Sequence, residues 1–166
     1  MEAWREEKVM AHGRPRLVLL CGLPGAGKTT TARRLEQELS AVRLAPDEWL
    51  SGLGFGLFDG DARERVEQCL WQHAQALLAS GAVVIMENGF WESAERDEKR
   101  LQARAMGAAV ELRYLQVPIE ELERRIALRN QEPGSAVLTV ELLRSFQEQF
   151  QPPTQDELDL FDAPLF

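Results

Sequence analysis

The stretch RLVLLCGLPGAGKTTT, residues 16–31, decides the fold of this 166-residue chain. An apolar run at residues 17–21 is typical of a buried parallel strand, and it stops at a glycine-rich turn that opens directly into a helical pattern. Within the stretch, Gly22, Gly27, Lys28 and Thr29 match the pattern G-x-x-x-x-G-K-S/T without a mismatch. Because motif and context agree, the stretch predicts a strand, a phosphate-binding loop (P-loop) and a helix.

The chemistry of such a loop comes from its backbone and from two side chains. Glycines allow backbone N–H groups to converge on an anion, and the following helix points its partial positive charge at the same place. We expect Lys28 to reach the β- and γ-phosphates of ATP and the Thr29 hydroxyl to hold Mg²⁺. The alternative is a glycine turn that matches the motif by coincidence. The residues expected to bind the nucleotide are Gly22, Leu23, Pro24, Gly25, Ala26, Gly27, Lys28, Thr29 and Thr30.

Length and composition are those of one globular domain, with 45% hydrophobic and 28% charged residues. We expect a flexible leader at residues 1–15, a nucleotide-binding domain at residues 16–150 and an irregular, acidic, proline-containing tail at residues 151–166. No apolar stretch approaches the roughly 18 residues of a membrane span. Cys21 and Cys69 are expected to be reduced and buried, which suits a cytoplasmic protein.

The formal net charge of −8 bears on the partners of the chain. Proteins that bind nucleic acid usually carry a basic footprint, so this acidic balance disfavours a polyanionic substrate. A local arginine patch can coexist with net acidity, which keeps nucleic acid open as an alternative. Nothing in the sequence indicates the oligomeric state.

Strand and helix patterns alternate along the chain after the P-loop. This alternation predicts βαβ units, a parallel sheet, and ligands bound at the carboxyl ends of the strands. Residues 51–60 contain four glycines and are expected to form a mobile apolar loop. Strands are expected at residues 17–21, 42–45, 83–87 and 110–117, and helices at residues 28–40, 61–80, 93–106, 119–129 and 140–150.

Asp47 follows the second predicted strand, nineteen positions after Lys28. If both strands deliver their ends to the same edge of the sheet, Asp47 faces the phosphates from the acceptor side. A carboxylate there can take the proton of an attacking hydroxyl group. The alternative is that Asp47 caps a short helix or forms a salt bridge. Glu48 is the neighbouring candidate for the same role.

Glu87 ends the third predicted strand. A carboxylate at this place is expected to hold Mg²⁺ through water or to hydrogen-bond the acceptor. The alternative is a strand-end carboxylate paired with an arginine, because ion pairs also occupy such sites. Asn88 is a second candidate of the same kind.

Arg125 and Arg129 are four residues apart and share one face of the helix predicted at residues 119–129. A helix in this place can close over the nucleotide as a lid and bring guanidinium groups to the transferring phosphoryl group. The alternative is ordinary surface pairing, for example of Glu121 with Arg125.

Three further residues are candidates for the acceptor site. Arg63 lies close in sequence to the glycine-rich loop, and the alternative for it is a solvated helix charge. Phe55 and Trp91 are candidates for an apolar wall, and core packing is the alternative for each. With Asp47 and Glu87 they form the predicted acceptor set.

Four segments together resemble the small P-loop kinases, a group that includes the kinase domain of polynucleotide 5′-kinases, chloramphenicol phosphotransferase and the zeta toxins, and that carries an AAA-type ATP-binding domain. The resemblance implies a three-layer α/β sandwich with a parallel sheet of four or five strands in the order 2-3-1-4, helices on both faces and a helical lid. It also implies that Asp47 is the general base and that Arg125 and Arg129 bind phosphate. The segments are GLPGAGKTT (22–30), APDE (45–48), VVIMENGFW (83–91) and RRIALRN (124–130).

The chain departs from some of these relatives. The Asp-Gly-Phe-Pro-Arg stretch of nucleoside monophosphate kinases is absent. Polynucleotide kinases are expected to carry an arginine three residues after this aspartate, but residues 48–50 contain none. We therefore expect an ATP- and Mg²⁺-dependent kinase acting on a hydroxyl group of a small molecule such as an antibiotic, a nucleoside or a sugar nucleotide. The alternatives are a polynucleotide 5′-hydroxyl kinase, a zeta-toxin-like kinase, and an ATP-binding protein that hydrolyses ATP slowly or not at all.

Overall fold

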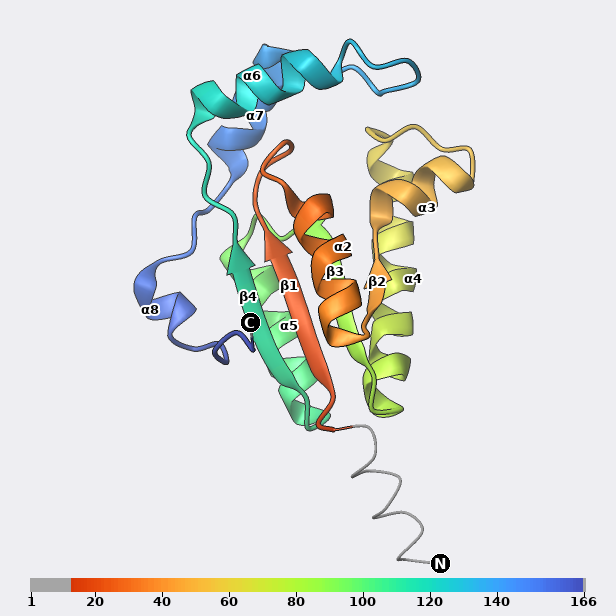
Figure 1. Cartoon of the computed structure of the whole chain (residues 1–166), viewed down its shortest axis with the longest axis vertical. Helices are drawn as coiled ribbons and strands as arrows, with labels where there is room; N and C mark the ends of the chain where they lie inside the picture. The colour runs from red at the N-terminus through yellow and green to blue at the C-terminus, as the bar shows by residue number, and fades with distance from the viewer. Residues whose placement is uncertain (1–12, 166) are drawn as a thin grey trace, which may run out of the picture.

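A computed structural model describes residues 13–165 of the chain (Figure 1). Residues 1–12 of the expected leader lie outside the described part. Strands and helices alternate from Arg16 onward, as the sequence predicts. The elements are β1 (Arg16–Cys21), α2 (Lys28–Leu39), β2 (Val42–Leu44), α3 (Pro46–Gly52), α4 (Gly60–Ala79), β3 (Val83–Gly89), α5 (Ser93–Ala105), β4 (Ala109–Tyr114), α6 (Ile119–Arg129), α7 (Val140–Gln149) and α8 (Gln155–Leu158).

The four described strands form one parallel sheet in the order β2-β3-β1-β4, which confirms the predicted order 2-3-1-4. β1 lies between two neighbours, so that Val18 is paired with Ile85 of β3 and with Glu111 of β4. The P-loop follows this central strand. It therefore emerges at the middle of the carboxyl edge, where ligands bind in open α/β sheets.

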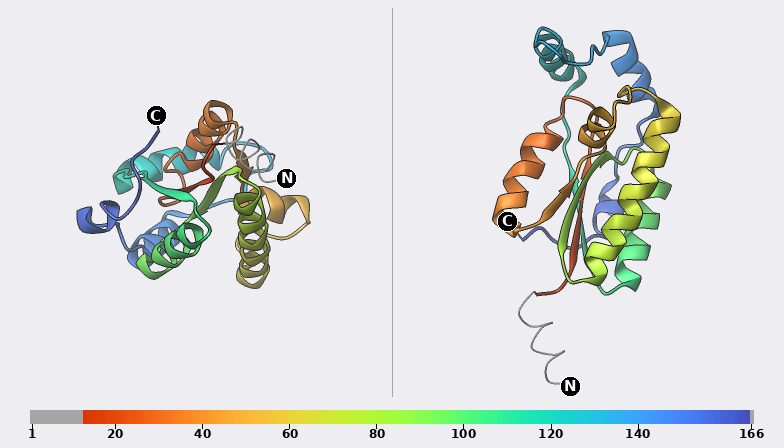
Figure 2. Two further views of the ribbon diagram at one scale, coloured as in Figure 1. Left: turned by 90° about the horizontal axis from the view of Figure 1, so that it is seen from below. Right: turned by 90° about the vertical axis from the view of Figure 1, so that its right-hand side faces the viewer.

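Helices cover both faces of the sheet, which confirms the three-layer arrangement. α2 lies on one face, and α4 and α5 lie on the other (Figure 2). α6 and α7 lie beyond the carboxyl ends of the strands (Figure 1). The molecule thus has a layered body and a helical pair above the edge that carries the P-loop.

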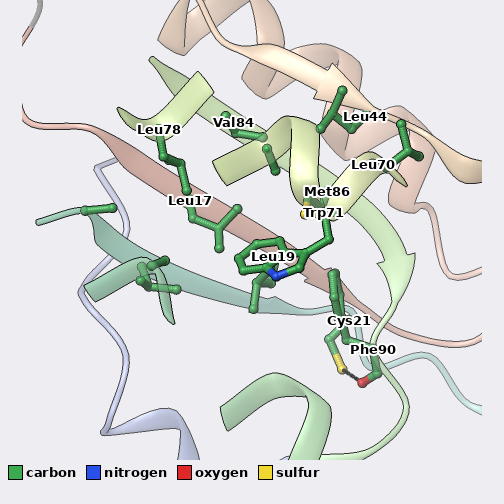
Figure 3. Close-up of a cluster of buried hydrophobic side chains, with 14 of the residues drawn as sticks. Leu17, Leu19, Cys21, Leu44, Leu70, Trp71, Leu78, Val84, Met86 and Phe90 are labelled. Atoms are coloured by element: carbon green, nitrogen blue, oxygen red, sulfur yellow. Dashed lines mark hydrogen bonds between the residues drawn. The ribbon is translucent and has the colours of Figure 1, made fainter. Parts of the chain in front are cut away.

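Alternation along β1 divides the core between the two faces of the sheet. Leu17, Leu19 and Cys21 point into the larger core, where they meet buried side chains of α4 and α5 (Figure 3). Val18 and Leu20 point to the other face and pack against α2. A strand buried on both faces is apolar throughout rather than alternating, which is the pattern that identified it in the sequence.

Some local expectations were wrong. Residues 51–60 do not all form a loop, because α3 continues to Gly52 and Asp59 caps the start of α4 by accepting a hydrogen bond from the Ala62 amide. Cys21 is buried as expected, but Cys69 is exposed, because it lies on the outer side of α4. Among residues 13–165, no helix is both long enough and apolar enough to cross a membrane.

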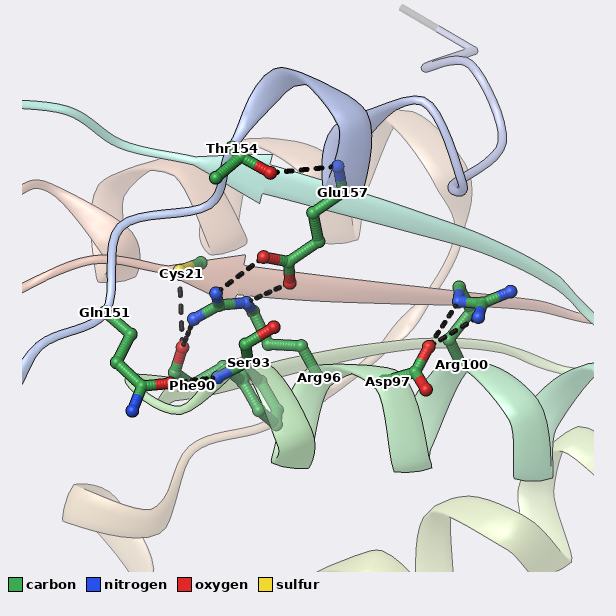
Figure 4. A network of polar contacts seen from close by, with 9 residues as sticks. All are labelled: Cys21, Phe90, Ser93, Arg96, Asp97, Arg100, Gln151, Thr154 and Glu157. Atoms are coloured by element: carbon green, nitrogen blue, oxygen red, sulfur yellow. Dashed lines mark hydrogen bonds and ion pairs between the residues drawn. The ribbon is translucent and has the colours of Figure 1, made fainter.

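The tail was expected to be irregular, but it contains the helical turn α8, whose first turn is capped by the Thr154 hydroxyl. The tail also packs on the domain. Asp162 exchanges two hydrogen bonds with Val110 of β4, at 2.7 and 2.8 Å. Glu157 accepts two hydrogen bonds, of 2.6 and 2.8 Å, from the fully buried guanidinium of Arg96 (Figure 4). A buried arginine needs a carboxylate, and only the folded tail supplies one here.

Candidate active site

The P-loop joins β1 to α2 with an open helix N-terminus. Gly27 is the N-cap residue of α2 and has a φ of 99°, a left-handed conformation that favours glycine. No side chain caps the first turn of α2, so its amide groups point out of the helix end unsatisfied by a cap. Lys28 Nζ donates to the carbonyl oxygens of Gly22 and Leu23, at 2.9 Å each. This arrangement suits an anion at the helix end.

Thr29 and Glu87 meet beside the P-loop. The Thr29 hydroxyl donates to Oε1 of Glu87 over 2.9 Å, although the two residues are 58 positions apart. A hydroxyl and a carboxylate are hard oxygen donors of the kind that Mg²⁺ takes, together with water and phosphate oxygens. The donor set therefore fits the magnesium ion expected from the sequence, with Thr29 and Glu87 as the residues that would hold it.

Glu87 also has an arginine partner, which is the alternative that the sequence left open for this carboxylate. Arg43 of β2 donates to Oε2 of Glu87 over 3.1 Å, and to both oxygens of Glu48 at 2.9 Å. Arg43 was not among the predicted residues. The signal that could have identified it is an arginine in a strand that ends at the ligand-binding edge.

Lys28 is the point at which the predicted residues come together. Burial lowers the pKa of Lys28 to about 8, while the charges of Asp47 and Glu87 oppose this shift and that of Arg129 adds to it. The charges of residues on three separate elements, α3, β3 and α6, thus act on that of Lys28. Cys21 also lies near Lys28, and burial raises the pKa of its thiol to about 12, so this cysteine stays a neutral thiol.

Asp47 lies in the first turn of α3, where Ala45 is the N-cap residue and no side chain makes a cap hydrogen bond. The cap alternative for Asp47 therefore has no support, whereas the salt-bridge alternative has a partner. Arg63 of α4 donates through Nη2 to Oδ1 of Asp47, whose side chain remains 55% exposed. Asp47 thus combines an ion pair with access from solvent.

The α6 helix sits directly on the P-loop. Leu122 and Ile126 of α6 pack in one buried cluster with Leu23 and Ala26 of the loop. This packing places the apolar face of α6 on the phosphate-binding segment. The helix predicted to close over the nucleotide as a lid is thus in contact with the P-loop.

Arg125 and Arg129 differ in their contacts. Arg125 Nη1 donates to the carbonyl oxygen of Gly25 over 3.2 Å, and its Nε donates to Glu121 over 2.7 Å. Arg124 donates to the same carboxylate, and the hydrogen bonds from Arg124 and Arg125 lower the pKa of Glu121 to about 2. Arg129 lies near Lys28, as described above. The surface pair foreseen for Arg125 is therefore present and the same guanidinium also contacts the P-loop, while its contact with phosphate stays a prediction.

Aromatic side chains connect the P-loop to the acceptor side. Trp91 Nε1 donates to the carbonyl oxygen of Gly22 over 3.3 Å, and its ring packs on Phe146 of α7 with centroids 4.9 Å apart. Gly89 has a φ of 91°, and a Cβ there would lie 2.9 Å from Trp91 Nε1, so a side chain would displace the indole. The ring centroids of Phe146 and Phe58 are 6.4 Å apart. Trp91 therefore faces the P-loop and the lid.

Phe55, the other aromatic residue predicted for the acceptor site, lies at a hollow whose lining includes neither Asp47 nor Trp91. Phe55 is exposed, and this hollow lies between the segment after α3 and the start of α4. Phe146 was not predicted for the site, since its contact with Trp91 depends on how α7 packs beyond the carboxyl ends of the strands. The hollow is completed by Asp59, Asp61, Ala62, Arg65 and Val66.

Solved structures share this fold. A chain of the Pnkp1/Rnl/Hen1 RNA repair complex matches with a TM-score of 0.69 and 23% identity, over 91% of this chain and 47% of that chain. A gluconokinase from Sinorhizobium meliloti 1021 matches with a TM-score of 0.61 and 19% identity, over 86% and 79% of the two chains. Kti12 from Chaetomium thermophilum, in complex with ADP-AlF3, matches with a TM-score of 0.66 and 16% identity, over 83% and 81%.

These likenesses establish a shared fold, and the chain spans about half the length of the RNA repair chain. No curated protein sequence matches it. The resemblance to small P-loop kinases is thus confirmed at the level of the fold. The family of AAA domains matches residues 17–153, most of the described chain, and the chain belongs to this family.

Proposed function

We propose that this chain is an ATP-dependent kinase that transfers the γ-phosphoryl group of ATP to a hydroxyl group of a small molecule. The observation that carries the proposal is the position of Asp47, which follows β2 in the first turn of α3 with its side chain 55% exposed. Binding of ATP alone needs no carboxylate on the acceptor side. A phosphoryl transfer to an alcohol does need one, because a proton must leave the hydroxyl group.

In the proposed reaction the acceptor oxygen forms a bond to the γ-phosphorus, and the bond from that phosphorus to the β–γ bridging oxygen breaks. ADP leaves with the electron pair of the broken bond, and Asp47 accepts the hydroxyl proton. Lys28 and the amides at the start of α2 hold the phosphates. Arg125 and Arg129 on α6 stabilise the charge on the transferring group.

Magnesium fits this site through Thr29 and Glu87, whose side chains meet at 2.9 Å. When bound, the ion neutralises phosphate charge. Arg43 holds Glu87 from its other oxygen, at 3.1 Å, and so fixes the direction in which the carboxylate points. A carboxylate fixed in this way is prepared for an ion rather than reorganised by it.

The charges near Asp47 favour an acceptor without phosphate groups. The guanidinium of Arg63 contacts the carboxylates of Asp47 and Glu67, and that of Arg43 contacts Glu48 and Glu87. Their positive charge is thus already balanced. Apolar side chains are exposed just after Asp47, and such a patch suits the apolar part of a small molecule. They are Trp49, Leu53, Phe55 and Phe58.

A second candidate acceptor is the 5′-hydroxyl group of RNA. The observation in its favour is the likeness of the fold to a chain of an RNA repair complex. The net charge of −8 and the balanced arginines speak against it. Phosphorylation of RNA would fall steeply with salt, whereas that of an uncharged small molecule would not.

The test is an ATP-consumption assay over a panel of hydroxyl compounds and a 5′-hydroxyl oligoribonucleotide, followed by variants. Asp47→Asn is expected to bind ATP as the wild type does and to lose transfer by about 100-fold or more, since general bases contribute factors of this order. Glu48→Gln, which changes the next carboxylate of α3, is the matched control and should keep most of the activity. Full transfer by Asp47→Asn would refute the proposed mechanism.

A further inference from the structure

Arg63 joins three segments of the acceptor side. Its Nη2 donates to Oδ1 of Asp47 in α3 and, over 3.0 Å, to the carbonyl oxygen of Leu57. Its Nη1 donates to Glu67, one turn further along α4, over 3.3 Å. The guanidinium is 31% exposed. A planar group that holds two acceptors through one nitrogen fixes the positions of those acceptors relative to each other.

The segment that Arg63 holds has few other hydrogen bonds to distant parts of the described chain. Within residues 53–58, the remaining hydrogen bonds of the described chain run to backbone atoms of residues 49–59. The segment also contains Gly54 and Gly56, and glycine loses more backbone freedom on ordering than any other residue. The bond from Arg63 to Leu57 is therefore the side-chain hydrogen bond that ties this segment to α4, beside the packing of Leu57 against the core and of Phe58 on Phe146.

The electrostatics agree with a fixed pair. Burial disfavours the charged guanidinium, but the hydrogen bond and the charge of Asp47 outweigh it, with a further contribution from Glu67, so the pKa of Arg63 is raised. Because two carboxylates already share its charge, Arg63 is poorly placed to bind an anionic group of the acceptor. This ion-paired role differs from the role considered for Arg63 in the sequence, that of a residue that binds the acceptor.

We propose that Arg63 is a positioning residue that orients the carboxylate of Asp47 and couples it to residues 53–58. Closing of this segment on an acceptor and alignment of the base are then one event. The proposal rests on the proposed function only in taking Asp47 as the base. The physical coupling from Asp47 through Arg63 to the segment exists whether or not transfer occurs.

The test measures amide hydrogen exchange in peptides that cover residues 53–58, in the full chain without ligand. Both Asp47→Ala and Arg63→Gln are expected to speed exchange there by about tenfold, the equivalent of one hydrogen bond. The double variant should be no faster than Arg63→Gln alone, because both changes break one chain of contacts. Arg34→Gln, which removes an exposed pair with Glu38 inside α2, should change nothing.

The readout separates coupling from a general loss of structure. Exchange in β1 and β3 reports global unfolding and should stay slow in every variant. Arg63→Lys should keep one contact at a time, so it should restore only part of the protection. Unchanged exchange in Asp47→Ala, or single effects that multiply in the double variant, would overturn the proposal. A transfer-active Asp47→Asn variant would overturn the proposed function and leave this result untouched.

Once the assay has identified an acceptor that the enzyme phosphorylates, steady-state kinetics provide a second readout. Arg63→Gln is expected to lower kcat by about tenfold and to leave the KM for ATP within about twofold, since the donor site does not contain it. A rise of the KM for ATP with unchanged kcat would place Arg63 in nucleotide binding and contradict the positioning role.

Discussion

The hydroxyl of Thr29 donates to Oε1 of Glu87 over 2.9 Å, and this bond joins the first turn of α2 to the end of β3. Glu87 is held on its other side by Arg43, over 3.1 Å. One oxygen of this carboxylate therefore lies beside the P-loop, and the other contacts the guanidinium of Arg43. Removing its charge should affect the metal more than the nucleotide.

Glu87→Gln is expected to raise the Mg²⁺ concentration needed for half-maximal turnover by about tenfold, because groups that orient or supplement metal ligands contribute 10- to 100-fold to metal affinity. Nucleotide binding in the absence of metal should change little. Thr29→Ser keeps the hydroxyl group and is the control. A Glu87→Gln enzyme with the Mg²⁺ requirement of the wild type would show that the carboxylate serves only Arg43.

Arg124 and Arg125 provide a matched pair on α6. Both donate to Glu121, but only Arg125 reaches the P-loop, at the carbonyl oxygen of Gly25. Arg125→Ala should therefore lower the single-turnover rate of transfer by roughly 100-fold, as expected for a cation on the transferring group. Arg124→Ala should stay within about twofold. Equal effects of the two substitutions would assign Arg125 to the surface pair alone.

The affinity for ATP should depend on pH through Lys28. Burial lowers the pKa of Lys28 in the free protein to about 8. Phosphate binds the protonated form, so each pH unit above about 8 should weaken ATP binding by about tenfold, while binding below it stays constant. Titration calorimetry from pH 7.5 to 9.5 measures this. Lys28→Arg stays charged and should lose the dependence; a flat profile for the wild type would contradict the lowered pKa.

The sequence predicted those parts of the structure that depend on local signals. The P-loop and the bounds of α6 at Ile119–Arg129 agree with expectation, because the glycine turn and Pro118 act on their immediate neighbours, whereas the strand order was expected from the resemblance to small P-loop kinases. Thr139, which directly precedes α7, caps this helix by accepting a hydrogen bond from the Leu142 amide. Motifs that lie next to strand ends could thus be placed at one edge of the sheet.

The pairing of charged side chains that lie far apart in the sequence could not be predicted. Arg63 and Asp47 are 16 positions apart, Arg43 and Glu87 are 44 apart, and Arg96 and Glu157 are 61 apart. Each pair depends on how whole elements pack, and 19 basic and 27 acidic residues allow many other pairings. The composition of the tail predicted an irregular segment. Its contact with Arg96 could not be foreseen, because in the sequence Arg96 is an ordinary residue of a charged helix.

The tail should contribute measurably to the stability of the protein and should support the position of the P-loop. Arg96, fully buried, donates to Glu157 and also, over 2.9 Å, to the carbonyl oxygen of Phe90 (Figure 4). Phe90 has a φ of 48°, unusual for a residue other than glycine, and it precedes the Trp91 that contacts Gly22. Glu157 therefore acts on the P-loop through a short chain of contacts.

Glu157→Gln leaves this buried guanidinium without its carboxylate and should lower the free energy of unfolding by about 3 kcal/mol, measured by urea denaturation. Asp156→Asn changes the exposed neighbour in the same turn of α8 and should cost less than about 0.5 kcal/mol. Combining Arg96→Met with Glu157→Gln should recover part of the loss, because no buried guanidinium is then left without a carboxylate. If Glu157→Gln were as stable as Asp156→Asn, the tail would be a passive cover that does not support the contact between Trp91 and Gly22.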